Sequence, residues 1–132
     1  MVSLSFSSCN KDKDRKVSNS ERLIGEWIYR TTQEKINGEW KDMPTQVGAE
    51  GMQTFYKDGK ALITMTFEGE YKEQKFEWNL KDNNDFIING TVRGQILFES
   101  NDCFYFYSDE TFDPEAGENI KGEFRDIYDR KK

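Results

Sequence analysis

The stretch ERLIGEWIYR, residues 21–30, places Gly25 two positions before Trp27, near the head of a first strand that we predict over LIGEWIYRTTQEKI, residues 23–36. β-branched and aromatic residues surround this pair, which is typical of a strand that packs against a core. A glycine inside a strand weakens it and often marks a point where another part of the chain approaches closely. We therefore expect another group to lie across the strand at Gly25, beside Trp27.

After Ser20 the chain is a series of short strand patterns separated by turn signals. Asn37-Gly38 and Asp58-Gly59 are two-residue pairs of the kind that form tight hairpins. Within the strands, aromatic and branched residues alternate with charged ones, so each strand has one face to bury. Only a short turn at SNSER, residues 18–22, departs from this pattern. The sequence therefore predicts an antiparallel meander of consecutive strands.

A meander of this kind has two free edges, which only closure or a second sheet can satisfy. A two-sheet sandwich needs long crossovers, and the short turns argue against them. We therefore predict an all-β fold, an antiparallel up-and-down barrel of about eight strands over residues 21–132. The interior of so small a barrel is either filled by side chains or holds one small ligand. The sequence leaves these two alternatives open.

Charge and composition exclude several classes of function. The 132 residues carry a net charge of −6, which argues against a nucleic-acid partner. The chain has no histidine, so it lacks the commonest general base and the usual zinc ligand. Most paired carboxylates, such as Asp126 and Asp129, are expected in turns or on outward faces, and the acidic loop 109–118 lacks an ordered spacing of calcium ligands. We predict no catalytic residues, no metal and no cofactor.

The N-terminus differs from the rest of the chain. Residues 6–9, FSSC, resemble a bacterial lipobox, in which the cysteine becomes the lipidated first residue. The resemblance implies that residues 1–20 are a truncated lipoprotein signal and flexible tether, with Cys9 as the membrane anchor. It also implies a bacterial cell-envelope location in the outer membrane, with the side of the membrane left open. The alternative is a disordered tail with one free thiol. Cys103, within DCFYFY, is expected in the barrel core or wall.

The pair Gly25 and Trp27 resembles the first signature of the lipocalins, in which the tryptophan closes one end of the barrel. In that family a basic residue from the last strand lies across the indole. Arg130 stands at the matching place, in phase with Phe124 and Tyr128, whereas Arg125 is out of phase. Over residues 22–131 the chain looks like the small bacterial lipocalin-like domain proteins, calycin-type barrels of which many are lipoproteins. The resemblance implies that Gly25, Trp27 and Arg130 close the barrel.

Two related barrels fit less well. Fatty-acid-binding proteins insert a helix pair after the first strand, and no such pair is visible here. Their carboxylate clamp is also missing, because Arg125 and Tyr128 are three residues apart and so on opposite faces. Avidin-like barrels gather several tryptophans around one ligand, and nothing in the sequence brings Trp27, Trp40 and Trp78 together.

Two functions follow from the predicted barrel. The first is a non-enzymatic module, expected to be monomeric, that binds a small apolar or amphipathic molecule. Strand parity gives its candidate lining residues: Phe55, Ile63, Met65, Phe67, Phe76, Trp78, Phe98, Phe104 and Phe106. The second is a filled barrel that binds or inhibits another protein through its loops, around Pro114, or through exposed Trp40 and Tyr105.

Overall fold

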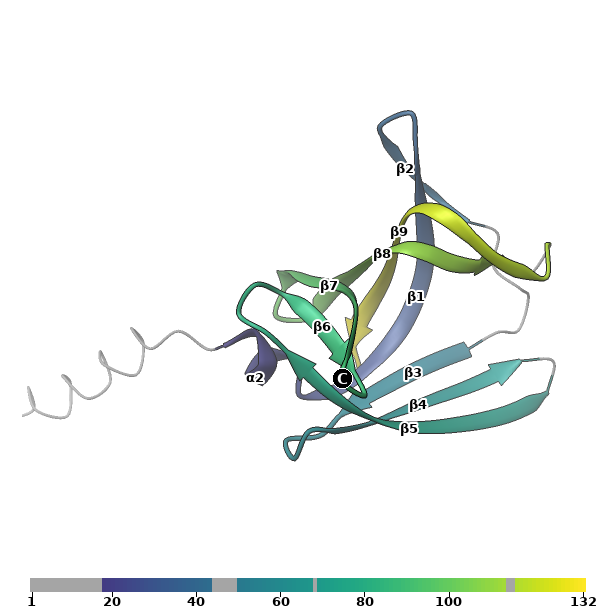
Figure 1. Cartoon of the computed structure of the whole chain (residues 1–132). Helices are drawn as coiled ribbons and strands as arrows, with labels where there is room; N and C mark the ends of the chain where they lie inside the picture. Colours follow the sequence, from purple (N-terminus) through teal and green to yellow (C-terminus); the bar gives the residue numbers. More distant parts are fainter. Residues whose placement is uncertain (1–17, 44–49, 68, 114–115) are drawn as a thin grey trace, which may run out of the picture.

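The computed structural model describes residues 18–43, 50–67, 69–113 and 116–132, except for the side chains of Phe67, Phe112 and Asp113. Among these residues a short helix is followed by the strands of a single sheet (Figure 1). The elements are α2 (Asn19–Leu23), β1 (Gly25–Ile36), β2 (Glu39–Asp42), β3 (Glu50–Phe55), β4 (Lys60–Phe67), β5 (Glu70–Leu80), β6 (Asp85–Ile88), β7 (Thr91–Ser100), β8 (Cys103–Asp113) and β9 (Glu118–Arg130).

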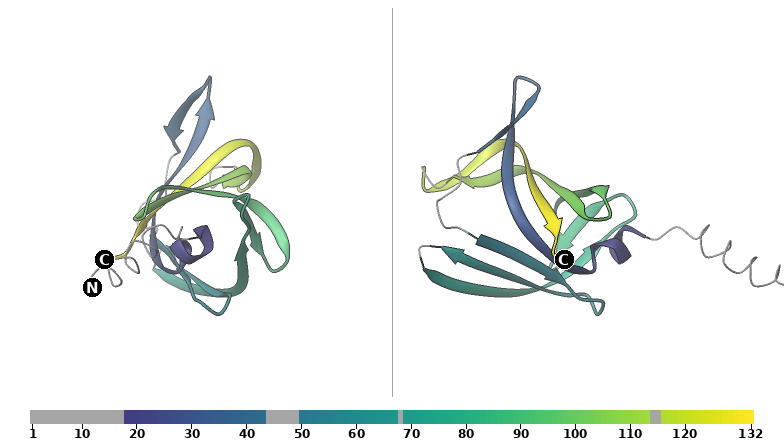
Figure 2. Two further views of the ribbon diagram at one scale, coloured as in Figure 1. Left: turned by 90° about the vertical axis from the view of Figure 1, so that its left-hand side faces the viewer. Right: turned by 180° about the vertical axis from the view of Figure 1, so that it is seen from behind.

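The sheet closes on itself. Strands β3 to β9 pair in chain order, β1 pairs with β3, and β9 returns to pair with β1, with Trp27 opposite Arg130. Every ladder is antiparallel, and eight strands form the ring. Strand β2 pairs only with the far part of β1, so the β1–β2 hairpin projects from the ring (Figures 1 and 2). The predicted all-β, up-and-down antiparallel barrel is confirmed.

The chain enters the barrel through α2, which corrects one expectation from the sequence. Leu23 was expected in the first strand, but it ends the helix and is fully buried. The Ser18 hydroxyl accepts a hydrogen bond from the Glu21 backbone N–H and so caps the helix start. The first strand therefore begins two residues later than expected, at Gly25. Figure 2 shows α2 lying over one end of the ring.

The acidic segment before β9 is also more regular than expected. Residues 109–118 were predicted to form a solvated loop, yet β8 continues to Asp113. Glu110 lies opposite Lys121 and Thr111 opposite Ile120, so cross-strand pairing with β9 extends the hairpin. Pro114 lies outside the described residues.

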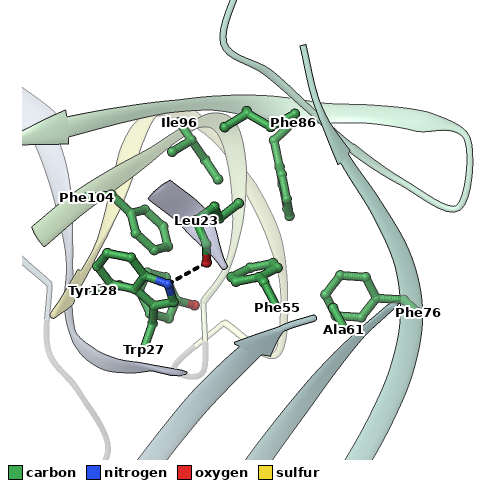
Figure 3. Close-up of a cluster of buried hydrophobic side chains, with 10 residues drawn as sticks. Leu23, Trp27, Phe55, Ala61, Phe76, Phe86, Ile96, Phe104 and Tyr128 are labelled. Atoms are coloured by element: carbon green, nitrogen blue, oxygen red, sulfur yellow. Dashed lines mark hydrogen bonds between the residues drawn. The ribbon is translucent and has the colours of Figure 1, made fainter. Parts of the chain in front are cut away.

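The core fills the end of the barrel beneath α2 (Figure 3). Trp27 packs edge to face against Phe104, with ring centroids 4.7 Å apart, and Phe104 stacks on Tyr128 at 5.0 Å. The buried cluster consists of Leu23, Trp27, Phe55, Ala61, Phe76, Leu80, Phe86, Ile96, Phe104 and Tyr128. These side chains define the inner face of the wall. Among the described residues, no helix is long and apolar enough to cross a membrane.

Candidate ligand-binding site

The α2 end of the barrel is sealed by Arg130. Its guanidinium carbon lies 4.3 Å from the centroid of the Trp27 ring, the contact expected from the sequence. The same guanidinium donates to the backbone carbonyls of Arg22 at 2.8 Å and Asn101 at 2.8 Å. The Trp27 indole donates to the Leu23 carbonyl at 2.8 Å, as the dashed line in Figure 3 shows. Helix, first strand and last strand are thus tied together at one point.

Gly25 provides the space that this arrangement needs. A Cβ atom on Gly25 would lie 2.8 Å from Nη1 of Arg130, and the residue has a φ of +132°, which L side chains rarely adopt. The close approach expected from the sequence at this glycine is therefore present, and the approaching group is the Arg130 side chain.

The predicted lining residues divide between a packed and an open region. Phe55, Phe76 and Phe104 are buried within the core cluster, so they fill the barrel beneath α2. Four others are partly buried and pack against that cluster: Ile63, Trp78, Phe98 and Phe106. Met65 also faces inward, because it lies two positions after inward-facing Ile63 on β4, and the ladder with β3 is regular from the pair Ile63–Gln53 to the pair Met65–Gly51. The Met65 side chain is nevertheless 50% exposed. The side chain of Phe67 lies outside the description.

The barrel is therefore filled at one end and accessible at the other. Gln74, opposite Ile63 on β5, faces inward and is exposed like Met65. Away from α2, the sheet of β3, β4 and β5 diverges from the β8–β9 hairpin in both side views (Figures 1 and 2). Solvent reaches the inner face at this end, so a molecule from solution can reach it too. We call this region the open end.

Polar side chains from β1 and β9 lie on the inner face near the open end. The Thr32 hydroxyl donates to Oδ1 of Asp126 at 2.7 Å, and the Tyr29 hydroxyl bonds to Thr32. Gln53 donates to the Tyr128 hydroxyl at 2.7 Å. Burial raises the pKa of the Asp126 carboxyl above its ordinary value, and burial also raises the pKa of Tyr29. These groups give an otherwise apolar wall a localised polar site.

Sequence reasoning missed this polar group, because it expected most paired carboxylates to lie in turns or on outward faces. Asp126 is half-buried on the inner face, whereas Asp129 faces outward and pairs with Arg30. The signal was available: Asp126 is in phase with Phe124 and Tyr128 along β9. Thr32 was hidden, since a bulge between Tyr29 and Thr31 brings Thr32 onto the same face as Tyr29.

The outward aromatic residues are less exposed than predicted. Trp40 and Tyr105 are half-buried on either side of Arg125, whose guanidinium carbon lies 4.3 Å and 4.5 Å from their ring centroids. Buried Cys103 lies beside Arg30. Among the residues that the structure describes, no group of His, Cys, Asp and Glu side chains could hold a metal ion. Asp126 and Asp129 point to opposite faces of β9, so these two carboxylates do not form an acid–base pair.

Comparison with known proteins gives only distant structural similarity. No family model matches the chain, and no curated protein does. The odorant-binding protein from bovine nasal mucosa is 14% identical, with a TM-score of 0.45, over 90% of this chain and 77% of that one. The same bovine protein in complex with a selenium-containing odorant gives 14% identity and a TM-score of 0.46, over 90% and 76%. Its complex with undecanal gives 15% identity and a TM-score of 0.45, over 90% and 77%.

Proposed function

We propose that this barrel is a non-enzymatic module that binds a small amphipathic molecule at the open end. The observation that carries the proposal is Met65, an inward-facing apolar side chain that remains 50% exposed in a closed barrel. Ile63 and Phe106 continue the apolar inner face toward the packed core. The polar site at Asp126 lies on the same face, so a ligand with an apolar body and a polar end matches both parts of the wall.

The proposal predicts that Met65→Lys weakens ligand binding. We expect an apolar fluorescent dye that brightens in hydrophobic surroundings to bind the native barrel, and the variant to bind it about tenfold more weakly, the equivalent of roughly 1.4 kcal/mol. A charged side chain at this point removes apolar contact area and adds a solvated group. Titration of the dye against each protein measures the change.

Leu97→Lys is the matched control, because Leu97 is 43% exposed but faces outward, next in sequence to inward-facing Phe98. Its dye affinity should equal that of the native chain. Equal losses in the two variants would mean that the dye binds elsewhere, and no binding by the native chain would contradict the proposed function.

The alternative is a module that binds another protein through its outer surface. A groove of about 590 Å³ next to the β1–β2 hairpin favours it, with Trp40, Tyr107 and Phe124 among the lining residues. Lys35 and Arg93 on one hand and Glu123 and Asp109 on the other give this groove charges of both signs. Retained dye binding in Met65→Lys together with loss in Trp40→Ala would favour this surface.

We further propose that the protein is a monomer held at a bacterial cell envelope, in the outer membrane, through lipid on Cys9. The support for the anchor and the location is the FSSC stretch alone, since Cys9 lies outside the described residues. Expression of the full chain in a bacterium that lipidates cysteines should give the mass of residues 9–132 plus an acylated glyceryl group on Cys9, and Cys9→Ser should abolish both the cleavage and the lipid. An unmodified mass for the native chain would contradict the anchor.

A further inference from the structure

We infer that the molecule bound at the open end carries a protonated amine, and that the Asp126 carboxylate holds it. This inference rests on the proposed function, and it adds the chemical class of the ligand. Asp126 lies on the inner face, directly opposite Thr32 on β1 and Phe106 on β8. Asp126 is a partly exposed residue outside the buried core cluster, so we expect a ligand inside the barrel to reach its carboxyl.

Within the part of the chain that the structure describes, no lysine or arginine pairs with the Asp126 carboxylate. Several exposed carboxylates of the described residues pair with a lysine or arginine, as those of Glu26, Glu77, Asp102 and Asp129 do. Asp126 forms no such pair, and its hydrogen-bond donor is the neutral Thr32 hydroxyl. Burial partly removes the Asp126 carboxylate from water, which costs free energy. A single hydrogen bond from a neutral hydroxyl offsets only part of that cost. A cation from solution would offset that cost.

The neighbours of Asp126 favour an ammonium over other cations. Phe124 and Tyr128 flank it on the inner face of β9, and Phe106 and Tyr29 lie on the same face of β8 and β1. Aromatic rings attract organic ammonium groups through their negative faces. A hard metal ion would need several oxygen ligands, and the described residues provide no such cluster. An anionic ligand would be repelled by the carboxylate.

The raised pKa of the Asp126 carboxyl is consistent with this reading, since it reflects a charged form that burial disfavours and that no protein cation restores. A bound ammonium would lower that pKa. The titratable groups whose charges interact with it in the free protein are the Tyr29 and Tyr128 hydroxyls.

The test compares three amphiphiles with the same alkyl chain: octylamine, octanol and octanoate. Each is titrated against the native chain by displacement of the bound fluorescent dye, and affinities are checked by calorimetry. We expect octylamine to bind at least about tenfold more tightly than octanol, with octanoate the weakest. Asp126→Asn, which keeps the shape of the side chain, should reduce octylamine affinity to that of octanol and leave octanol unchanged.

Glu123→Gln is the matched control, because it removes the same charge from an exposed residue of β9. The preference for octylamine should persist in this variant. Equal affinities for octylamine and octanol in the native chain, or a preference that survives Asp126→Asn, would overturn the inference while leaving the proposed function intact. If none of the three binds, the proposed function fails and this inference fails with it.

A second measurement avoids any dependence on the folding of the variant. Carbon-13 NMR of the Asp126 carboxyl in the native chain gives its titration curve with and without each amphiphile. Saturating octylamine should lower the pKa of this carboxyl, whereas octanol should leave it unchanged or raise it. An unchanged titration in the presence of bound octylamine would show that the amine lies elsewhere, which overturns the inference.

Discussion

Replacing Trp27 by alanine should lower the free energy of unfolding by about 3–5 kcal/mol, the range for a large aromatic residue lost from a packed core. Trp27 is fully buried and contacts Phe104 and Phe98. Its loss also removes the surface on which Arg130 lies and the hydrogen bond to Leu23. Since small domains have only about 5–15 kcal/mol of stability, the variant should be close to unfolded at growth temperature. Urea unfolding followed by circular dichroism measures the change.

Trp40→Ala is the control for the loss of a tryptophan. Trp40 is half-buried outside the core and contacts Arg125 and Tyr107. Its replacement should lower the free energy of unfolding by about 0.5–2 kcal/mol, which is the range for a cation–π contact between exposure to solvent and partial burial. Comparable losses in the two variants would mean that the α2 end is not the main stabilising core.

Replacing Gly25 by alanine is expected to cost about 2–4 kcal/mol. A non-glycine residue at a φ of +132° is strained by about 1–3 kcal/mol. The new methyl group would also push the Arg130 guanidinium from its place over Trp27, since its Cβ would lie 2.8 Å from Nη1. The two effects act on one residue but have different origins. Urea unfolding of the variant gives their sum.

Gly38→Ala separates these origins, because Gly38 also has a positive φ, +83°, but a Cβ there meets nothing within 4 Å. Its cost should reflect backbone strain alone. A double-mutant cycle then isolates the contact: in an Arg130→Met background, the cost of Gly25→Ala should fall to that of strain. An undiminished cost in that background would show that Arg130 is not the group that Gly25 accommodates.

The contact that closes the barrel was predictable from the sequence because the last part of β9 has no bulge. From Phe124 to Arg130 the alternation of faces is unbroken, so parity correctly selected Arg130 over Arg125 as the basic residue that the resemblance implies across Trp27. The same reasoning would place Thr32 on the outward face, since the bulge after Tyr29 reverses the phase of β1. Leu23 was misplaced because an apolar pair before a strand looks like part of it. The cap formed by Ser18 and Glu21 was the signal for a helix.

Parity also gives the face of a residue but not the depth of packing around it. Phe76 and Met65 share the inner face, yet Phe76 is 6% exposed and Met65 is 50% exposed. The difference depends on what lies opposite across the barrel, and that is set by strand lengths and by α2, which enters only one end. The open end therefore became visible only in three dimensions, whereas the phase of β9 already indicated that Asp126 faces inward.

The β1–β2 hairpin has a consequence for behaviour at high concentration. Closure of the ring by β9 hides the two edges that an open meander would present, but β2 remains at the end of the strand order. A free edge strand is a template for pairing with another molecule. Here it is four residues long, and three of them, Glu39, Lys41 and Asp42, are charged and exposed. Because this edge strand is short and charged, it is a poor template for pairing with a second molecule. We therefore expect the protein to resist edge-to-edge aggregation of its sheets at high concentration.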